Sequence, residues 1–492
     1  MNKLFLSSQV QEYEKSYFGK GNLDKNLMLK AAEVTAEYIT KNYKHKKYIC
    51  ICGPGNNGGD GYYVGICLFN AGFDVKIVDA LENKTKSHLC VEASNAARDK
   101  GLIYKPSILN KVDSDVLIID AIFGTSLKGS FDKHIINLIQ TMNSYEHIFS
   151  IDVPSGIHPD TGVACKAYVD ANKTISFVGR KLGLSLNEGK IAAGEKYFHN
   201  LNLQMEKESQ AVATSYTFDD VKNLLPKRLS NSHKGDHGSA LVMGGDMDMG
   251  GAAILAAEAA LKSGTGLVSL LTQPIHLEAS LSRNPEIMAI GYDQPKEIGL
   301  ALNNKNVFIC GPGLSASSWS EQVMKILIEH IEINSGSVVF DAGALRYIAN
   351  NDLCLKNVKN SLVLTPHPGE AAALLGLSSK DIQADRINAA KNLVAKYNAT
   401  IVLKGAGTII ATDDDLFVCE EGGPELATGG TGDILAGLIG SFIAQGLSAH
   451  NASLLAVATH GIAGSEFVKL NGEKGLAASE LIPLIRKKLN NK

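Results

Sequence analysis

Two glycine-rich segments carry polar residues whose types could hold a phosphate and move a proton. Gly53–Gly61 reads GPGNNGGDG, and Leu426–Gly437 reads LATGGTGDILAG. We expect each segment to lie at a helix start, where unpaired backbone N–H groups and the helix dipole attract an anion. Asp433, in the second segment, could act as a base beside that anion. A tight turn in the first segment and a helix cap at Asp433 are the alternative interpretations.

Three further polar residues of the first half stand at or near the predicted ends of apolar strands. Asp120 precedes FGTSLKG, Asp152 lies in IDVPSG, and Lys128 lies in the loop Gly124–Ser130. Because the carboxyl ends of parallel strands meet at one edge of a sheet, we expect these side chains to converge. Such a group could bind a cation or serve as an acid–base pair, whereas a lone aspartate there is often only a helix cap.

Three motifs of the second half fit a nucleotide-binding enzyme. KGAGT, at Lys404–Thr408, could wrap phosphates with its lysine and its backbone amides. TPHPGE, at Thr365–Glu370, presents His367 and Glu370, and GPGL, at Gly311–Leu314, follows an apolar strand. Since two prolines hold the loop around His367, a ligand contact and a structural role are equally open for this residue.

These residues need a scaffold that brings distant segments together, and the hydrophobic pattern predicts one. In the first half, short apolar runs alternate with helical patterns, which is typical of a parallel sheet with helices on both faces. We therefore expect a Rossmann-like three-layer α/β sandwich. The expected strands are Tyr48–Cys52, Val75–Ala80, Val116–Ala121, His147–Val153 and Thr174–Val178, and the expected helices are Leu23–Tyr43, Tyr62–Ala71 and Ser87–Lys100.

The second half repeats this alternation and predicts a second α/β domain. The polar stretch Gln204–Ser215 separates the halves, so the predicted domains are residues 1–208 and 215–492. A long alanine-rich helix, Ala252–Lys262, follows the first strand of the second half, and a hairpin is expected at Thr408–Thr412 and Leu416–Cys419. The expected strands are Ala240–Met243, Leu267–Leu271, Val307–Cys310, Val338–Asp341, Leu362–Thr365 and Ile401–Leu403.

Composition and charge argue against several classes of protein. The 492 residues have a net charge of −3 and are 45% hydrophobic, which argues against disorder and against a general binder of nucleic acid or anionic membranes. The longest apolar run, Ile434–Leu447, is too short to span a membrane. The 8 cysteines are scattered, and Cys50 and Cys52 are expected in the core. We expect a cytoplasmic protein that binds small molecules, with neither nucleic acid nor membrane as a partner.

Three motifs of the first half, NNGGDG, DAIFGTSLKG and IDVPSG, resemble those of the N-terminal YjeF family, the NAD(P)H-hydrate epimerases. The resemblance implies that Asn57, Asp120 and Ser155 ligate K⁺, and that Asp152 and Lys128 catalyse the proton transfers of epimerisation. It also implies a set of contacts to the hydrated nicotinamide nucleotide: Asn56, Asn57, Gly58, Gly59, Asp60, Gly124, Thr125, Ser126, Leu127, Lys128, Gly129, Ser130 and Asp152.

The second half, over residues 225–490, is similar to the C-terminal YjeF family, the ADP-dependent NAD(P)H-hydrate dehydratases. The order of GGDMDMGG, NPEIM, GPGL, TPHPGE, KGAGT and TGGTGD carries the resemblance. It implies a ribokinase-like α/β domain that phosphorylates the 6-hydroxyl of the hydrated nucleotide, with Asp433 as base and Mg²⁺ on the phosphates, and then eliminates phosphate. The implied contacts to the hydrated nucleotide are Ala253, Gly313, His367 and Asp433, and those to ADP are Lys404, Gly405, Ala406, Gly407, Thr408 and Gly432.

The chain departs from the pattern of this family at three positions. Gly343 stands in DAGAL where the family usually has DADAL, Ser315 replaces the last glycine of GPGLG, and Asp246 follows GG where a serine is usual. Because TGGTGD is intact, we still expect a bifunctional repair enzyme, in homo-oligomeric form. The alternatives are a ribokinase-like kinase of a small alcohol fused to a regulator, and a first domain that only binds nucleotide and partners.

Overall fold

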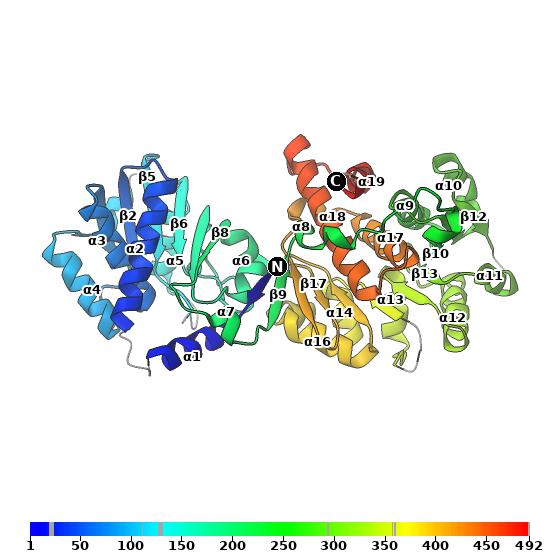
Figure 1. The fold of residues 1–492 in the computed structure, drawn as a ribbon, viewed down its shortest axis with the longest axis horizontal. Helices are drawn as coiled ribbons and strands as arrows, with labels where there is room; N and C mark the ends of the chain where they lie inside the picture. The colour runs from blue at the N-terminus through cyan, green and yellow to red at the C-terminus, as the bar shows by residue number, and fades with distance from the viewer. Residues whose placement is uncertain are drawn as a thin grey trace. The chain divides into compact units, whose positions relative to one another are not determined.

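The computed structural model describes residues 1–18, 24–110, 112–125, 131–292, 295–356, 358 and 361–490. The chain divides into two compact units, Asn2–Thr214 and Ser215–Lys492, and each unit contains its own sheet and core (Figure 1). No helix among the described residues is long and apolar enough to cross a membrane.

A parallel sheet runs through the first unit, with strand order β4-β3-β2-β5-β6-β7-β8. Its strands are β4 (Ile103–Tyr104), β3 (Asp74–Asp79), β2 (Lys47–Cys52), β5 (Val116–Ala121), β6 (His147–Ile151), β7 (Lys173–Phe177) and β8 (Glu195–His199). Every residue of β5 is buried, as expected for a central strand of a sheet that is covered on both faces. This observation confirms the predicted α/β class for the first half.

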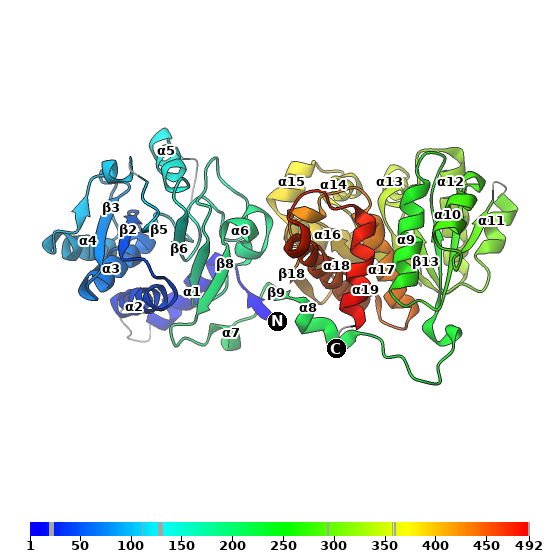
Figure 2. The same ribbon diagram turned by 90° about the horizontal axis from the view of Figure 1, so that it is seen from above.

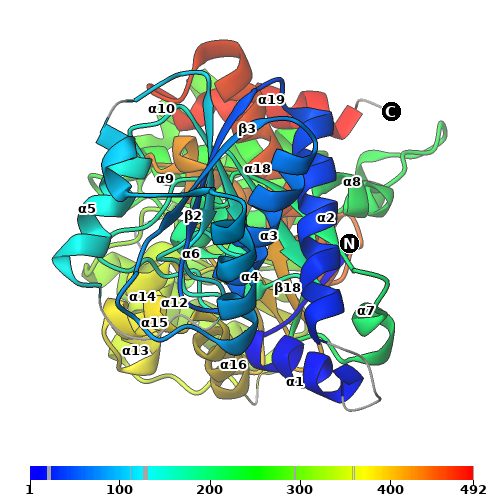
Figure 3. The same ribbon diagram turned by 90° about the vertical axis from the view of Figure 1, so that its left-hand side faces the viewer.

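Helices cover both faces of this sheet. One apolar core packs α2, α3 and α4 against the sheet, and a separate core packs α5 against the opposite face, so β2 and β3 lie between α5 and α3 (Figure 3). Cys50 and Cys52 lie in the first of these cores, as predicted. The helices of this unit are α1 (Ser7–Phe18), α2 (Asp24–Asn42), α3 (Asn56–Asn70), α4 (His88–Asp99), α5 (Lys133–Met142), α6 (Asn187–Ala192) and α7 (Met205–Glu208).

The second unit is also built around a sheet, which contains strands in the order β9-β18-β17-β16-β15-β14-β13-β10-β11-β12. The strands are parallel from β16 to β12, whereas β17 and β18 form the predicted antiparallel hairpin. Their bounds are β9 (Ala213–Tyr216), β10 (Ser239–Met243), β11 (Leu267–Thr272), β12 (Met288–Gly291), β13 (Val307–Cys310), β14 (Ser337–Phe340), β15 (Ser361–Leu364), β16 (Thr400–Leu403), β17 (Ile409–Ala411) and β18 (Leu416–Cys419).

The main core of the second unit lies under α9, α17, α18 and α19, which pack on one face of the sheet, whereas α12 contacts β13 on the other face (Figure 2). The helices are α8 (Phe218–Val221), α9 (Gly250–Lys262), α10 (Leu277–Arg283), α11 (Pro295–Ala301), α12 (Ser318–Ile333), α13 (Ala342–Asn350), α14 (Pro368–Leu375), α15 (Ser379–Ala384), α16 (Arg386–Tyr397), α17 (Thr431–Ala444), α18 (Ala449–Asn471) and α19 (Ala478–Asn490).

The structure differs from the sequence prediction mainly at short elements. Strand β1 (Asn2–Leu4), β4, β8, β9 and β12 were not expected, because they are short or exposed and lack a continuous apolar run. Helix α3 begins at Asn56 and not at Tyr62. The glycine-rich segment NNGGDG therefore forms the beginning of the helix itself, over more than its first turn.

Two candidate active sites

The first candidate site is a cavity of about 640 Å³ at the carboxyl ends of the strands of the first sheet. Six of the residues predicted to bind the hydrated nucleotide line this cavity: Asn56, Asn57, Asp60, Gly124, Thr125 and Asp152. Residues of α1 and α2, including Val10, Leu27 and Met28, supply an apolar wall. The other predicted residues of the loop, Ser126, Leu127, Lys128, Gly129 and Ser130, lie outside the described residues.

Helix α3 points its amino-terminal turn toward the cavity without a side-chain cap, so its first N–H groups remain available to an anion. Gly58 and Gly59 are buried and are not part of the cavity wall. A Cβ atom on Gly58 would lie 1.9 Å from the carbonyl oxygen of Gly53, and one on Gly59 would lie 2.7 Å from Met28 Cε. These glycines allow the helix to pack closely against its own loop and against α2.

Oxygen atoms gather beside this helix start. The buried carboxylate of Asp120 accepts hydrogen bonds from Ser155 Oγ (2.6 Å), Ser155 N (2.8 Å) and Ser150 Oγ (2.9 Å). Asn57 donates through Nδ2 to the Phe123 carbonyl (3.0 Å), and its buried Oδ1 has no hydrogen-bond partner among the described residues. The three predicted potassium ligands therefore lie around a common carbonyl, because Ser155 Oγ is also 3.4 Å from the oxygen of Phe123.

Asp152 is held at the end of β6 in a left-handed backbone conformation, with φ of 67°. Its carboxylate forms an ion pair with Lys181, which is only 3% exposed and also donates to the Phe177 carbonyl at 2.8 Å. Lys181 was not singled out from the sequence. It follows β7 in the segment GRKLG, and nothing in the local spacing distinguishes it from an ordinary surface lysine.

The second candidate site gathers charged groups at the carboxyl ends of β14, β15 and β16. Lys404 Nζ lies 2.8 Å from Asp341 Oδ1 and 3.8 Å from Glu370 Oε2, and Thr365 donates to Asp341 at 2.7 Å. A Cβ atom on Gly432 would lie 3.4 Å from Lys404 Nζ and 3.8 Å from Asp341 Oδ2. The start of α17 therefore faces this cluster, as the sequence predicted for a phosphate site.

The cluster controls the protonation of Asp433, in the first turn of α17. Burial raises the pKa of Asp433 to about 7, and the charge of Asp341 adds to this rise although Lys404 opposes it. Burial alone would lower the pKa of Lys404, but the carboxylates of Asp341 and Glu370 raise it above its usual value. A carboxyl group that titrates near neutral pH beside a fixed ammonium is well suited to general base catalysis.

His367 has a structural role that is compatible with a ligand contact. Its Nδ1 accepts hydrogen bonds from Gly369 N (3.0 Å) and Glu370 N (3.3 Å), which caps α14. The side chain nevertheless remains 49% exposed, so its outer face is open to a substrate.

The loop Lys404–Thr408 is organised by Arg386, a residue that sequence reasoning missed. The guanidinium is fully buried and donates to the carbonyls of Ala406 (2.5 Å), Leu403 (3.1 Å) and Lys404 (3.3 Å). Gly405 adopts φ of 145°, and a Cβ atom there would lie 2.8 Å from Arg386 Nη2. Two carbonyls of the predicted phosphate loop, those of Lys404 and Ala406, therefore accept hydrogen bonds from the same buried cation as the Leu403 carbonyl at the end of β16.

The three departures from the family pattern are neighbours in space. Ser315 and Ser317 donate hydrogen bonds to Asp246, and a Cβ atom on Gly343 would lie 2.2 Å from the carbonyl oxygen of Leu314. Burial alone would raise the pKa of Asp246, but these hydrogen bonds lower it to about 2. The carboxylate of Asp246 is therefore satisfied by serine hydroxyl groups.

The same contacts join the loops that carry the predicted substrate residues Gly313 and Ala253. Asp246 N donates to the Gly313 carbonyl (2.9 Å), and a Cβ atom on Gly245 would lie 3.3 Å from Ala253 Cβ. Gly313 itself has φ of 71°, and a Cβ atom there would lie 2.4 Å from the Met249 carbonyl.

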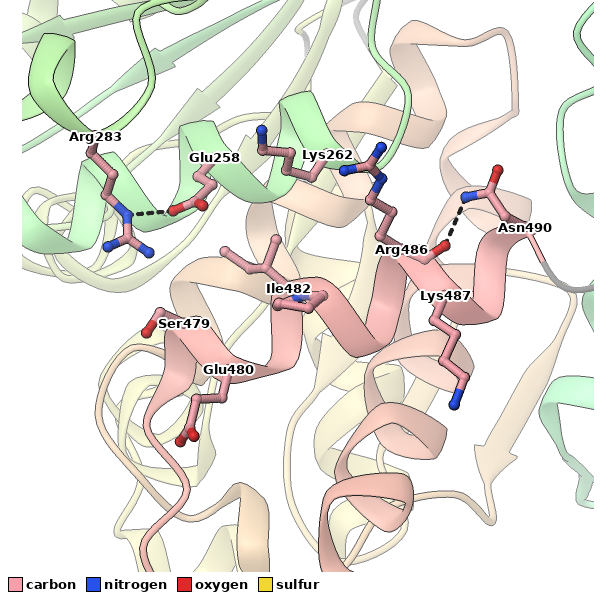
Figure 4. Close-up of a pocket in the computed structure, with 10 residues that line it drawn as sticks. Glu258, Lys262, Arg283, Ser479, Glu480, Ile482, Arg486, Lys487 and Asn490 are labelled. Carbon is pink, nitrogen blue, oxygen red and sulfur yellow. Dashed lines mark hydrogen bonds and ion pairs between the residues drawn. The ribbon is translucent and has the colours of Figure 1, made fainter. Parts of the chain in front are cut away.

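A second cavity, of about 690 Å³, lies between α9, α10 and α19 in the same unit (Figure 4). Most of the residues that line it are polar or charged, and two of them, Arg283 and Glu258, form an ion pair at 2.5 Å. It contains none of the predicted site residues. We therefore take the charged cluster near α17, and not this cavity, as the second candidate site.

Comparison with known proteins decides the family. The family model for NAD(P)H-hydrate dehydratase matches residues 240–487, and that for the YjeF-related protein N-terminus matches residues 24–183. The chain is 34% identical, over 496 aligned residues and 100% of both chains, to the bifunctional NAD(P)H-hydrate repair enzyme Nnr of Coxiella burnetii. The chain belongs to the bifunctional NAD(P)H-hydrate repair enzymes. A second such enzyme, from Escherichia coli, is 33% identical over 94% of this chain and 89% of its own length.

Solved structures confirm the ribokinase-like fold of the second domain. The ADP/ATP-dependent NAD(P)H-hydrate dehydratase from Bacillus subtilis, co-crystallised with ATP/Mg²⁺, is 31% identical with a TM-score of 0.51, covering 56% of this chain and 97% of that one. A ribokinase-like protein from Enterococcus faecalis is 26% identical with a TM-score of 0.52, covering 57% and 96%. The family resemblance of both halves is thus confirmed.

Proposed function

We propose that residues 1–208 interconvert the R and S epimers of hydrated NADH and NADPH, and that residues 215–492 dehydrate the S epimer at the expense of ADP. The observation that carries the second assignment is the group of Asp341, Glu370 and Lys404 beside Asp433 at the start of α17. It combines a cation for phosphate with a base that titrates near neutral pH.

In the second domain, Asp433 removes the proton from the 6-hydroxyl group, whose oxygen then takes the terminal phosphoryl group of ADP. AMP leaves, and loss of the phosphate and of a ring proton restores the reduced nicotinamide. Lys404 and the N–H groups at Gly432 stabilise the phosphoryl oxygens. Gly405, Ala406, Gly407 and Thr408 contact ADP, whereas Ala253, Gly313 and His367 contact the hydrated nucleotide.

Mg²⁺ fits this site through carboxylate oxygen. Asp341 Oδ1 is occupied by Lys404 and Thr365, but Oδ2 points toward Gly432 and has no hydrogen-bond partner among the described residues. Mg²⁺ prefers one or two carboxylates together with phosphate oxygens. Asp341 would hold such an ion, which would neutralise charge on the phosphates of ADP.

In the first domain, K⁺ fits the oxygen atoms beside α3. The buried Oδ1 of Asn57 lacks a partner among the described residues, and Asp120, Ser155 and the Phe123 carbonyl supply further oxygens. These donors are one carboxylate together with amide, hydroxyl and carbonyl oxygens, a set that suits a weakly charged cation better than zinc, which is bound mainly by Cys and His. Bound K⁺ would hold the α3 loop in place near the substrate phosphates.

The residues that line the cavity of the first domain supply the remaining contacts to the substrate. Asn56, Asn57, Asp60, Gly124 and Thr125 contact the hydrated nucleotide, and Asp152 acts with Lys128 on its hydroxyl group. Gly58 and Gly59 contribute indirectly, because the absence of their side chains lets the start of α3 pack closely beside the cavity.

We also propose that the chain works in the cytoplasm as a homo-oligomer, with small molecules as partners and without nucleic acid or membrane. The eight cysteines are all free, which agrees with a reducing compartment. Light scattering of the purified chain measures the oligomeric state.

The test is a product balance with purified chain, hydrated NADH and either ADP or ATP. With ADP we expect one AMP and one phosphate for each NADH formed. The rival kinase predicts a stable phosphorylated alcohol from a vitamin alcohol and nucleotide, without recovery of NADH. A stable phosphorylated alcohol without recovery of NADH would refute the proposed dehydratase activity.

A further inference from the structure

The two carboxyl groups of the first cavity have different surroundings. Asp152 is paired with Lys181, whose second hydrogen bond goes to the Phe177 carbonyl at 2.8 Å. Asp60, at the start of the second turn of α3, lines the same cavity but has neither a hydrogen bond nor an ion pair within the described residues. Asp152 is therefore paired with a buried cation, whereas Asp60 is available to interact with a molecule bound in the cavity.

Two tight turns at the ends of neighbouring strands bring Asp152 and Lys181 together. Asp152 and Val178 adopt φ of 67° and 66°. In each turn the next N–H donates back across the turned residue, from Val153 to Ile151 (2.9 Å) and from Gly179 to Phe177 (2.7 Å). A positive φ is costly for a β-branched residue such as Val178, and such backbone conformations persist mainly where a functional group must be placed.

Resting on the epimerase activity proposed above, we propose that Asp60 and Asp152 divide the proton transfers between them, and that Lys181 sets this division by holding Asp152 as the carboxylate. Asp60 is then the acid and Asp152 the base. Both are catalytic residues in contact with substrate, whereas Lys181 is a positioning residue.

The charges around Asp60 favour its protonated form. Burial raises the pKa of Asp60 well above its usual value, and the charges of Asp152 and of Glu14 on α1 raise it further, whereas Lys181 opposes the rise. Lys15 lines the cavity as well. An acid and a base can thus coexist in one cavity at neutral pH, as two interacting carboxyl groups do in other enzymes.

The proton transfers balance with Asp60 as the acid and Asp152 as the base, and the role left to Lys128 is to bind the hydroxyl oxygen. Asp60 gives its proton to the 6-hydroxyl, the carbon–oxygen bond breaks with its electron pair on oxygen, and water departs. The ring nitrogen lone pair forms the carbon–nitrogen double bond of an iminium ion. Water adds to the other face of that carbon, the electron pair returns to nitrogen, and Asp152 takes the proton that the added water loses. The reverse path uses the same groups with exchanged roles.

The test measures epimer interconversion by full-length variants, with the S epimer as starting material and no ADP present. We expect Asp60→Asn and Asp152→Asn to slow interconversion by 10²- to 10⁴-fold, the usual contribution of general acid–base catalysis. The exposed replacements Asp99→Asn and Lys166→Met serve as matched controls and should keep the wild-type rate. Wild-type activity should fall at alkaline pH as Asp60 loses its proton, and this fall should disappear in Asp60→Asn.

Lys181 is tested by its effect on the pH profile. We expect Lys181→Met to change the pH profile of interconversion, because Asp152 loses its cationic partner, and Lys181→Arg to restore much of the wild-type profile because it keeps the charge. A wild-type rate and profile in Asp60→Asn, or an unchanged profile in Lys181→Met, would overturn the proposal. Absence of interconversion by the wild-type chain would instead refute the epimerase assignment, so the two failures are distinguishable.

Discussion

Replacing Asp433 by asparagine should abolish dehydration and at the same time stabilise the second domain at alkaline pH. Burial raises the pKa of this carboxyl group to about 7, and Asp341 adds to the rise. Ionising Asp433 in the folded domain therefore costs free energy that the unfolded chain does not incur. The catalytic base would thus be maintained at the expense of stability, as is common at active sites.

The size of the expected stabilisation follows from the pKa shift of Asp433. A rise from 3.8 to about 7 corresponds to about 4 kcal/mol, at about 1.4 kcal/mol for each pH unit. Between these two pKa values the folded state keeps the proton and the unfolded state does not, so stability falls as pH rises through this window and stays low above it. Because the variant also removes an ionic neighbour of Lys404, we expect a net gain of about 2 kcal/mol at a pH of about 8 and little gain at about pH 4.

The single tryptophan makes this measurable in the full chain. Trp319 lies in α12 of the second unit and is 6% exposed, so its fluorescence reports the unfolding of that unit in urea. Asp413→Asn, in the exposed turn between β17 and β18, is the control and should change stability little at either pH. If Asp433→Asn lowered the free energy of unfolding at alkaline pH, or raised it equally at both pH values, the assignment of Asp433 as a base whose ionised form destabilises the folded domain would be refuted.

Three further predictions concern residues around the sites. Arg386→Met should raise KM for ADP at least about tenfold, because three backbone carbonyls lose their donor, and steady-state kinetics with Arg386→Lys as partial rescue check it. Asp246→Asn should lower the free energy of unfolding by about 1 to 2 kcal/mol at neutral pH. Because the folded pKa of Asp246 is about 2, the stability that this group gives the wild-type protein is present above the usual aspartate pKa and is lost as the pH falls toward 2. Acid titration followed by Trp319 fluorescence measures this loss. Asn57→Ala, or replacement of K⁺ by a bulky organic cation, should slow epimerisation and leave dehydration of the pure S epimer unchanged; equal loss of both activities would speak against a potassium site in the first domain.

The layers of both domains were predictable from sequence because buried parallel strands form continuous apolar runs. Val116–Ala121 is such a run, and its bounds were predicted as observed. Strands with exposed residues, such as β8 (Glu195–His199) and β12 (Met288–Gly291), give no such run and were missed. Their pairing depends on a neighbour in the sheet and not on their own composition.

Of the residues in the candidate sites, the sequence predicted only those that stand in recognisable motifs. Asp433, Lys404 and His367 stand in motifs, so they could be proposed from the sequence. Lys181 and Arg386 were missed because their partners are a carboxylate and main-chain carbonyls contributed by other segments, which no local spacing records. The partnership of Asp246 with Ser315 likewise joins two loops that are distant in sequence.

A glycine-rich motif can indicate either a ligand-binding loop or close packing of the backbone, and the sequence alone does not distinguish the two. The motif NNGGDG indicated a ligand loop, and the helix start does lie at the cavity. Gly58 and Gly59 themselves, however, serve the close packing of α3 against Gly53 and Met28. A glycine beside a ligand and a glycine beside backbone look identical in sequence, since both are required by a close approach.

The most direct test of the account is the recovery of reduced-nicotinamide absorbance from a mixture of R and S hydrates by the purified chain with ADP. We predict full recovery in two phases, a fast one for the S epimer already present and a slower one for the S epimer supplied by the first domain. Recovery of only the initial S fraction would contradict the epimerase assignment, and no recovery would contradict the account as a whole.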